Sequence, residues 1–195
     1  MEMATQTLPG RREQILEAAL RLIGRSGREA VTHRAVAEEA GVPLGSTTYY
    51  FDSRDDLLGQ ALEHVARSEA DRYAELGTEL RKAKTPRALA DMLLAELASE
   101  AEDRTTHIAE YELWLEAAHR PELREAATVW CDAVQLAIAG ALEKLGSNDP
   151  HADASLVVAA MDGLGERALG RKEDLGETTA EFRPQLRRLI ERLVA

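Results

Sequence analysis

The sequence predicts an all-α protein, and three observations support this. Ala, Leu, Glu and Arg dominate the composition, whereas aromatic residues make up only 4% of it, a balance that favours helices over strands. Apolar residues recur at the three- and four-residue spacing of helices, and we find no convincing strand, repeat or low-complexity segment. At 195 residues with 45% hydrophobic content, the chain can form one or two small domains with real cores.

The first five segments are assigned in order. Residues 1–10 lack the basic start and apolar stretch of a secretion signal, so we expect a disordered tail. A helix over about 11–26 ends at Gly27. Thr32 caps a second helix that ends at Gly41, and a short third helix covers about 45–51. Ser53 and Asp56 form a capping-box variant that opens a long helix from about residue 54 toward 80.

The later segments have similar boundary signals. Thr85 as cap and Pro86 at the first position start a helix that runs to about 101. Further helices are expected over about 105–118, 121–145 and 151–170, with the clearest break at 146–150. After a linker that contains Gly and Thr, the last helix is expected over about 179–194.

Bulk properties exclude several classes of protein. No apolar run is long enough to span a membrane, and the single cysteine, Cys131, rules out an intrachain disulfide, which fits the cytoplasm. The net charge is −11, yet residues 11–34 hold 6 Arg against 3 Glu. The basic segment is enough to contact DNA phosphates. The negative net charge excludes a protein that binds nucleic acid over its whole surface.

Residues 31–51 carry the most informative pattern. They form two short helices joined by a tight turn at Gly41, the layout of a helix-turn-helix, whose second helix enters the DNA major groove. A solvated helix surface normally carries Lys and Glu. The second helix instead offers uncharged hydroxyls and aromatic rings, which are suited to contact with a partner. These residues are Ser46, Thr47, Thr48, Tyr49 and Tyr50.

On these residues the chain resembles the TetR family of bacterial transcriptional repressors. The matching features, from about Arg11 to Leu62, are the run at 15–23, Gly27, Val31-Thr32, Val36-Ala37, Ala40-Gly41-Val42, Tyr49-Tyr50-Phe51 and Leu57-Leu58. The remaining two-thirds is similar only in being helical. The resemblance implies a helix-turn-helix DNA-binding domain over 11–55 and a helical ligand-binding and dimerisation domain over 56–195, with the helix from about residue 54 linking them.

The resemblance and the helix geometry agree on a DNA-binding set. A helix N-terminus favours a phosphate near His33 and Arg34, and the start of the third helix is the end that reaches base edges. Gly45 has no side chain to read a base and departs from many relatives. The expected DNA-binding residues are Thr32, His33, Arg34, Leu44, Gly45, Ser46, Thr47, Thr48, Tyr49, Tyr50 and Arg54.

Two helices have features of a subunit interface. The helix over 151–170 has apolar or small residues on two sides, which indicates burial on both, and the last helix has a strong apolar stripe. These patterns fit either an intramolecular core or, as the resemblance implies, pairing with a second copy of the chain. The expected homodimer residues are Leu156, Ala159, Gly163, Arg167, Leu186, Leu189, Ile190 and Leu193.

The C-terminal part shows no catalytic constellation, no metal-ligand spacing and no cofactor motif. Large, adaptable apolar side chains with polar tips suggest either core filling or a pocket for a small apolar effector. They are Met92, His107, Tyr111, Trp114, Trp130, Cys131 and Met161. Glu110, Glu112 and Glu116 flank this group, and we expect most of them to be solvated; one that points inward would favour a cationic ligand.

These observations predict a ligand-responsive transcriptional repressor that binds a palindromic operator as a homodimer. Two alternatives stay open. One is a DNA-binding regulator without a small-molecule effector, and the other is an α-helical enzyme or carrier whose N-terminal motif is incidental. Operator binding separates the last of these from the two regulators.

Overall fold

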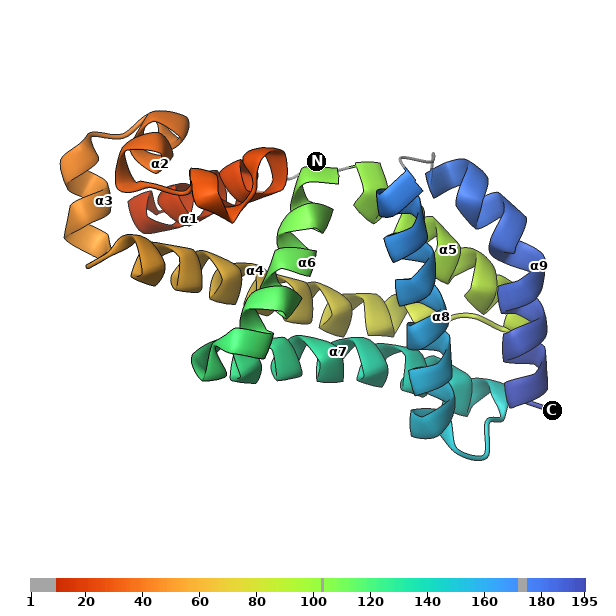
Figure 1. Ribbon diagram of the computed structural model, residues 1–195. Helices are drawn as coiled ribbons and strands as arrows, with labels where there is room; N and C mark the ends of the chain where they lie inside the picture. The colour runs from red at the N-terminus through yellow and green to blue at the C-terminus, as the bar shows by residue number, and fades with distance from the viewer. Residues whose placement is uncertain (1–9, 103, 172–174) are drawn as a thin grey trace, which may run out of the picture. The chain divides into compact units, whose positions relative to one another are not determined.

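The computed structural model describes residues 10–102, 104–171 and 175–195, which form α-helices and one short 3₁₀ helix (Figure 1). No strand occurs within these ranges, and the all-α prediction is confirmed. The expected tail over 1–10 lies, except for Gly10, outside the described residues.

Two of the N-terminal helices begin directly after the capping residues Thr32 and Ser53, as predicted. The N-terminal elements are α1 (Arg11–Ser26), η1 (Arg28–Ala30), α2 (His33–Ala40), α3 (Leu44–Tyr50) and α4 (Arg54–Leu80). The Thr32 hydroxyl oxygen accepts a hydrogen bond from the Ala35 N–H at 3.1 Å, and Ser53 Oγ accepts from the Asp56 N–H at 3.0 Å. The carboxylate of Asp56 accepts from the N–H of Asp52 at 2.9 Å, one residue before the cap.

The later helices are α5 (Pro86–Glu102), α6 (Arg104–His119), α7 (Pro121–Leu145), α8 (Pro150–Arg171) and α9 (Leu175–Leu193). Thr85 caps α5 as predicted, because its hydroxyl accepts from the Ala88 N–H at 3.1 Å. Helix α9 begins earlier than the predicted residue 179. The expected linker falls partly on residues 172–174, outside the described part of the chain.

The chain forms two compact units. The first contains the residues up to Val65 together with 105–123, and the second contains 66–104 and 124–195. Most of α6 therefore belongs with α1, α2 and α3, whereas the domain boundary expected from the sequence lies near residue 55. At the join between α1 and α6 the backbones nearly touch, because a Cβ on Gly24 would lie 2.0 Å from the Thr105 carbonyl oxygen.

The core of the first unit holds α1, α2 and α3 in place. Ile15 and Ile23 of α1, Val36 of α2 and Phe51 after α3 are at most 1% exposed. Leu57, Leu58 and Leu62 complete this core from the start of α4. The apolar periodicity of the first helix therefore marks its buried face, and α1 packs against α2 and α3.

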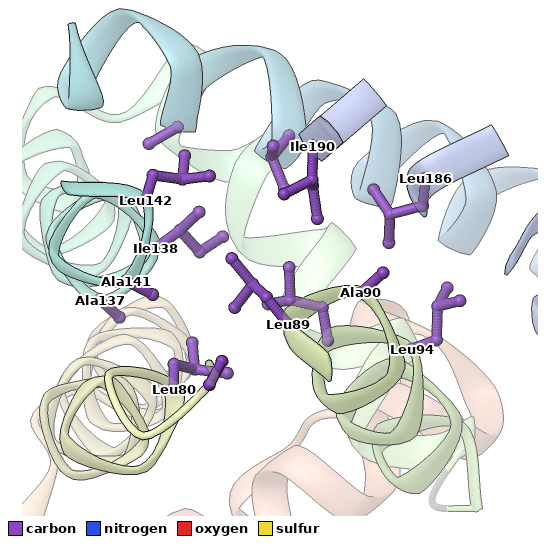
Figure 2. Close-up of a cluster of buried hydrophobic side chains, with 14 of the residues drawn as sticks. Leu80, Leu89, Ala90, Leu94, Ala137, Ile138, Ala141, Leu142, Leu186 and Ile190 are labelled. Carbon is purple, nitrogen blue, oxygen red and sulfur yellow. The ribbon is translucent and has the colours of Figure 1, made fainter. Parts of the chain in front are cut away.

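The second unit has a separate core built by α4, α5, α7, α8 and α9 (Figure 2). Leu80, Leu89, Leu142, Leu186 and Ile190 are fully buried in it. The two predicted faces of α8 are distinct. Val157 and Leu164 are buried, whereas Leu156 on the other face is 53% exposed and Ala159 and Gly163 are also exposed.

Candidate nucleic-acid interface

A left-handed residue makes the turn between α2 and α3. Gly41 has φ 65° and ψ 32°, a conformation that costs about 1–2 kcal/mol for a residue with a side chain. The Val42 N–H donates to the Ala37 carbonyl at 2.9 Å and closes the end of α2. The turn is open, since a Cβ at Gly41 would have no neighbour within 4 Å. Gly41 is thus needed for its backbone conformation and not for space.

Ion pairs fasten α2 to α1. The Glu39 carboxylate accepts hydrogen bonds from Arg25 and from Arg21 Nε, the latter at 3.0 Å. These two guanidinium groups, Arg25 first, hold the pKa of Glu39 below its usual value. The carboxylate therefore stays ionised at neutral pH, and both pairs persist there.

The outward face of α3 lacks charge. Tyr49 is 79% exposed and Leu44 is 50% exposed, and Gly45 and Thr48 lie on the same side at helical spacing. Tyr50 is 37% exposed and its ring meets that of Tyr49 edge-on at 5.0 Å. This surface offers methyl groups, three hydroxyls and the bare backbone of Gly45, which are groups that contact base edges and sugars.

The structure corrects the prediction for Thr47. This residue is fully buried, and its hydroxyl donates to the Leu44 carbonyl at 2.8 Å and lies 3.4 Å from the His33 carbonyl oxygen. Its side chain therefore joins α3 to α2 and has no surface to offer to DNA. Ser46, which is half-buried, lies between this inner face and the outer one.

The structure gives Arg54 contacts within its own unit, and the predicted phosphate contact stays a prediction. Arg54 Nε donates to the Val31 carbonyl at 2.8 Å, and Nη2 donates to the Arg28 carbonyl at 2.9 Å and to the Glu29 carboxylate at 3.2 Å. These acceptors engage Nε and Nη2. Arg54 therefore ties the start of α4 to the segment before α2.

The start of α2 keeps the groups predicted to meet a phosphate. Arg34 is exposed, and Thr32 is exposed with its oxygen already used as the helix cap. His33 is half-buried, and its Nδ1 is buried without a hydrogen-bond partner among the described residues. Arg34 is accordingly the exposed, positively charged side chain at the start of α2.

Sequence reasoning missed a buried ion-pair network in the first unit. Glu116 is only 3% exposed and forms ion pairs with Arg28 and with Arg120, whose Nε lies 2.7 Å from Glu116 Oε2. Arg120 also donates to the Asp55 carbonyl at 3.2 Å. The expectation that Glu116 is solvated is wrong, and Glu110, at 7% exposure, is buried too. The four-residue spacing between Glu116, in the last turn of α6, and Arg120, just after that helix ends, was the signal in the sequence.

The predicted effector residues are divided between the two units. His107, Tyr111 and Trp114 lie on α6 in the first unit, and Met92, Trp130, Cys131 and Met161 lie in the second. His107 is 6% exposed, with Nδ1 3.3 Å from a Glu110 oxygen but not in hydrogen-bonding geometry. Cys131 is exposed, and partial burial, with Asp162 and Asp132 nearby, raises the pKa of its thiol. An effector site stays a prediction.

The predicted dimer residues also separate into two groups. Leu186 and Ile190 are fully buried in the core of their own chain, so they have no surface for a second subunit and their assignment is corrected. Leu189 and Leu193 pack partly against the same core. Leu156, Ala159, Gly163 and Arg167 are exposed along one face of α8.

Helix α2, the Gly41 turn and the exposed face of α3 define a helix-turn-helix protein of the DNA-binding class. Comparison with known proteins agrees. The family described as "Bacterial regulatory proteins, tetR family" matches residues 15–61, and the family described as "Tetracyclin repressor-like, C-terminal domain" matches residues 84–195. The chain belongs to the TetR family of helix-turn-helix transcriptional regulators, so it is a regulator and not an enzyme.

Individual relatives share this assignment. The chain is 36% identical over 85 residues to the HTH-type transcriptional regulator PksA of Bacillus subtilis. The aligned region is 43% of this chain and 42% of that protein. The chain is 29% identical over 162 residues to the HTH-type transcriptional regulator BetI of Brucella anthropi, 80% of each chain. The crystal structure of the multidrug binding protein EbrR complexed with ethidium matches with a TM-score of 0.69 and 33% identity, over 95% of this chain and 99% of that one.

The part of the chain that the structure describes contains no cluster of three or more His, Cys, Asp or Glu residues able to hold a metal ion. Within the same part, no helix combines the length and apolar character needed to cross a membrane.

The two neighbouring threonines of α3 provide a test of which face is outward. Thr47→Val should lower the free energy of unfolding by about 1 kcal/mol, because it removes a buried hydrogen bond, and should leave base preference unchanged. Thr48→Val should change stability by less than about 0.5 kcal/mol and should alter base preference. Urea denaturation and binding to a panel of single-base operator variants measure both effects. A shift of base preference in Thr47→Val without loss of stability would contradict the assignment.

Proposed function

We propose that the protein is a ligand-responsive repressor that acts in the cytoplasm and binds a palindromic operator as a homodimer. The observation that carries the DNA-binding part is the uncharged, exposed face of α3, held outward by the buried Thr47. A solvated face of this length would normally carry charged side chains. Contact with base edges explains why this face carries hydroxyls, aromatic rings and a glycine instead of charged side chains.

In this proposal, the exposed groups of α2 and α3 contact different parts of the DNA. Leu44 and the ring of Tyr49 contact thymine methyl groups or sugars, and the Thr48 hydroxyl bonds a base edge or a phosphate. Gly45 lets the backbone of α3 approach the groove closely. Arg34 and the first N–H groups of α2 hold a phosphate, which sets the register of α3 without reading sequence.

Selection from a random duplex pool tests the DNA-binding proposal. The wild type should enrich one palindrome, and its affinity should fall steeply with salt because bound phosphates release counterions. Arg34→Ala should weaken binding about equally for all sequences and lower the salt slope by about 1. Fluorescence anisotropy at several salt concentrations measures both quantities.

Lys144→Ala is the matched control, since it removes an exposed cation from α7 in the second unit. It should leave the affinity and the salt slope as in the wild type. A wild type that enriches no sequence at moderate salt would end the proposal of a specific operator.

The exposed face of α8 supports the dimer proposal. Leu156, Ala159 and Gly163 recur at helical spacing and bring little side-chain bulk, and Arg167 continues the same face. Small residues let two helices approach closely, and the exposed Leu156 gains from burial against a copy of itself. A two-fold dimer then requires an operator with matching symmetry.

Leu156→Asp should convert the dimer to a monomer, because pairing would bury an uncompensated charge. The side chain is 53% exposed in the single chain, so folding should be unaffected. Leu136→Asp on α7, where the leucine is 59% exposed, is the matched control and should remain dimeric. Sedimentation velocity at micromolar concentration measures both. Monomeric wild type, or dimeric Leu156→Asp, would contradict this interface.

The proposal of an effector draws support from the aromatic side chains of α6 and from a relative. Tyr111 and Trp114 are half-buried on α6, and the ring of the buried His107 lies edge-on to Tyr111 at 5.3 Å. EbrR, the multidrug binding protein, has been crystallised with ethidium, proflavin and malachite green. We infer that the effector of the present protein is a small, largely apolar molecule that contacts these aromatic rings.

Proflavin and malachite green serve as probes of the effector site. Each should quench tryptophan fluorescence and lower operator affinity by about 5–150-fold, the usual size of allosteric coupling. Trp114→Ala should lose this response while its operator binding without dye stays normal. Leu115→Ala is the matched control, because Leu115 is the next residue and is 63% exposed. Its operator binding should respond to the dyes as that of the wild type does.

These dyes also bind DNA directly, so the variants provide the necessary contrast. An equal loss of operator binding in wild type and Trp114→Ala would reflect dye on DNA and would contradict the effector proposal. The ligand-independent regulator would then replace it, with the DNA-binding proposal intact.

A further inference from the structure

The second unit contains a cleft that neither DNA binding nor the proposed effector site uses. Helices α5 and α9 lie side by side (Figure 1), and a cleft of about 380 Å³ opens between them. Four arginines line it, and so do two carboxylates. These residues are Arg87 and Asp91 from α5 and Arg183, Arg187, Arg188 and Glu191 from α9.

The carboxylates of the cleft are already engaged. Arg183 Nη1 lies 2.6 Å from Asp91 Oδ1 and joins the two helices, and Arg187 Nε donates to Glu191 at 2.9 Å. Each of these pairs has a net charge of zero. Asp91 and Glu191 therefore orient two guanidinium groups along the walls of the cleft.

The other two arginines account for the excess positive charge of the cleft. Arg87 Nε is 3.9 Å from Asp91 Oδ2, and that carboxylate is held much closer by Arg183. Arg188 has no carboxylate within 4.0 Å among the described residues, and its side chain is exposed. The cleft thus has an excess of two positive charges in a chain whose net charge is −11.

We propose that this cleft binds a small molecule that carries at least two anionic groups, either carboxylates or phosphates. Guanidinium groups pair with both in bidentate geometry, and arginine is favoured over lysine where such recognition matters. The cleft volume falls within the range of small-molecule sites. Pro184, which also lines the cleft, adds an apolar wall beside the cations. One anionic group meets Arg87 and the other meets Arg188, which spreads the ligand across both helices.

Citrate and pyrophosphate are the probes, added to the free full-length protein at constant ionic strength set with sodium chloride. Isothermal titration calorimetry should detect binding of at least one, and the one bound identifies the carboxylate or the phosphate class. The double variant Arg87→Gln/Arg188→Gln should weaken that binding at least about tenfold, a loss of about 1.4 kcal/mol. Neither arginine makes a close ion pair, so the variant should keep the wild-type melting temperature.

Lys144→Gln/Arg192→Gln is the matched control, because it removes the same charge from exposed positions that do not line the cleft. It should bind the probe within about twofold of the wild type. The proposal is overturned if neither probe binds the wild type at millimolar concentration, if the cleft variant binds as tightly as the wild type, or if the control loses binding equally. No DNA is present, so these outcomes are independent of operator binding.

Discussion

The seating of α3 on the rest of its unit is the constraint on which the DNA-binding surface depends. Thr47 turns its hydroxyl to the Leu44 carbonyl, near that of His33, and Phe51 closes the end of the helix in the core. The left-handed Gly41 sets the angle at which the helix leaves α2. With the inner face anchored at these points, Leu44, Thr48 and Tyr49 have only one direction in which to project. Recognition chemistry thus rests on residues that never contact DNA.

Helix boundaries were predictable because they are set by local chemistry. Thr32, Ser53 and Thr85 each accept the backbone N–H that a capping residue is expected to accept. The orientation of α3 was not predictable in this way. Thr47 and Thr48 are adjacent and chemically identical, and a helix of seven residues has too few apolar positions to mark its inner face. A threonine satisfies its hydroxyl on its own helix, so burial leaves no trace in the sequence.

Charged residues show the same limit over longer distances. Arg54 bonds carbonyl groups more than 20 positions earlier, and Glu116 meets Arg28 from across the unit. From the sequence, Arg54 was expected to contact DNA and Glu116 to be solvated, because an isolated Arg or Glu is usually exposed. Leu186 and Ile190 were uncertain for a related reason. An apolar stripe predicts that one face of a helix is buried. It does not indicate whether the packing partner belongs to the same chain or to a second subunit.

Cys131 has a practical consequence for studies of this protein. It is the only cysteine of the sequence and lies exposed on α7, so a thiol reagent attaches one probe per chain at a known place. Partial burial raises the pKa of its thiol, with help from Asp162 and Asp132. The thiolate is the nucleophile, so maleimides and iodoacetamides react slowly at neutral pH and faster in alkaline buffer. Because the chain has one cysteine, labelling with a thiol reagent is selective without mutagenesis.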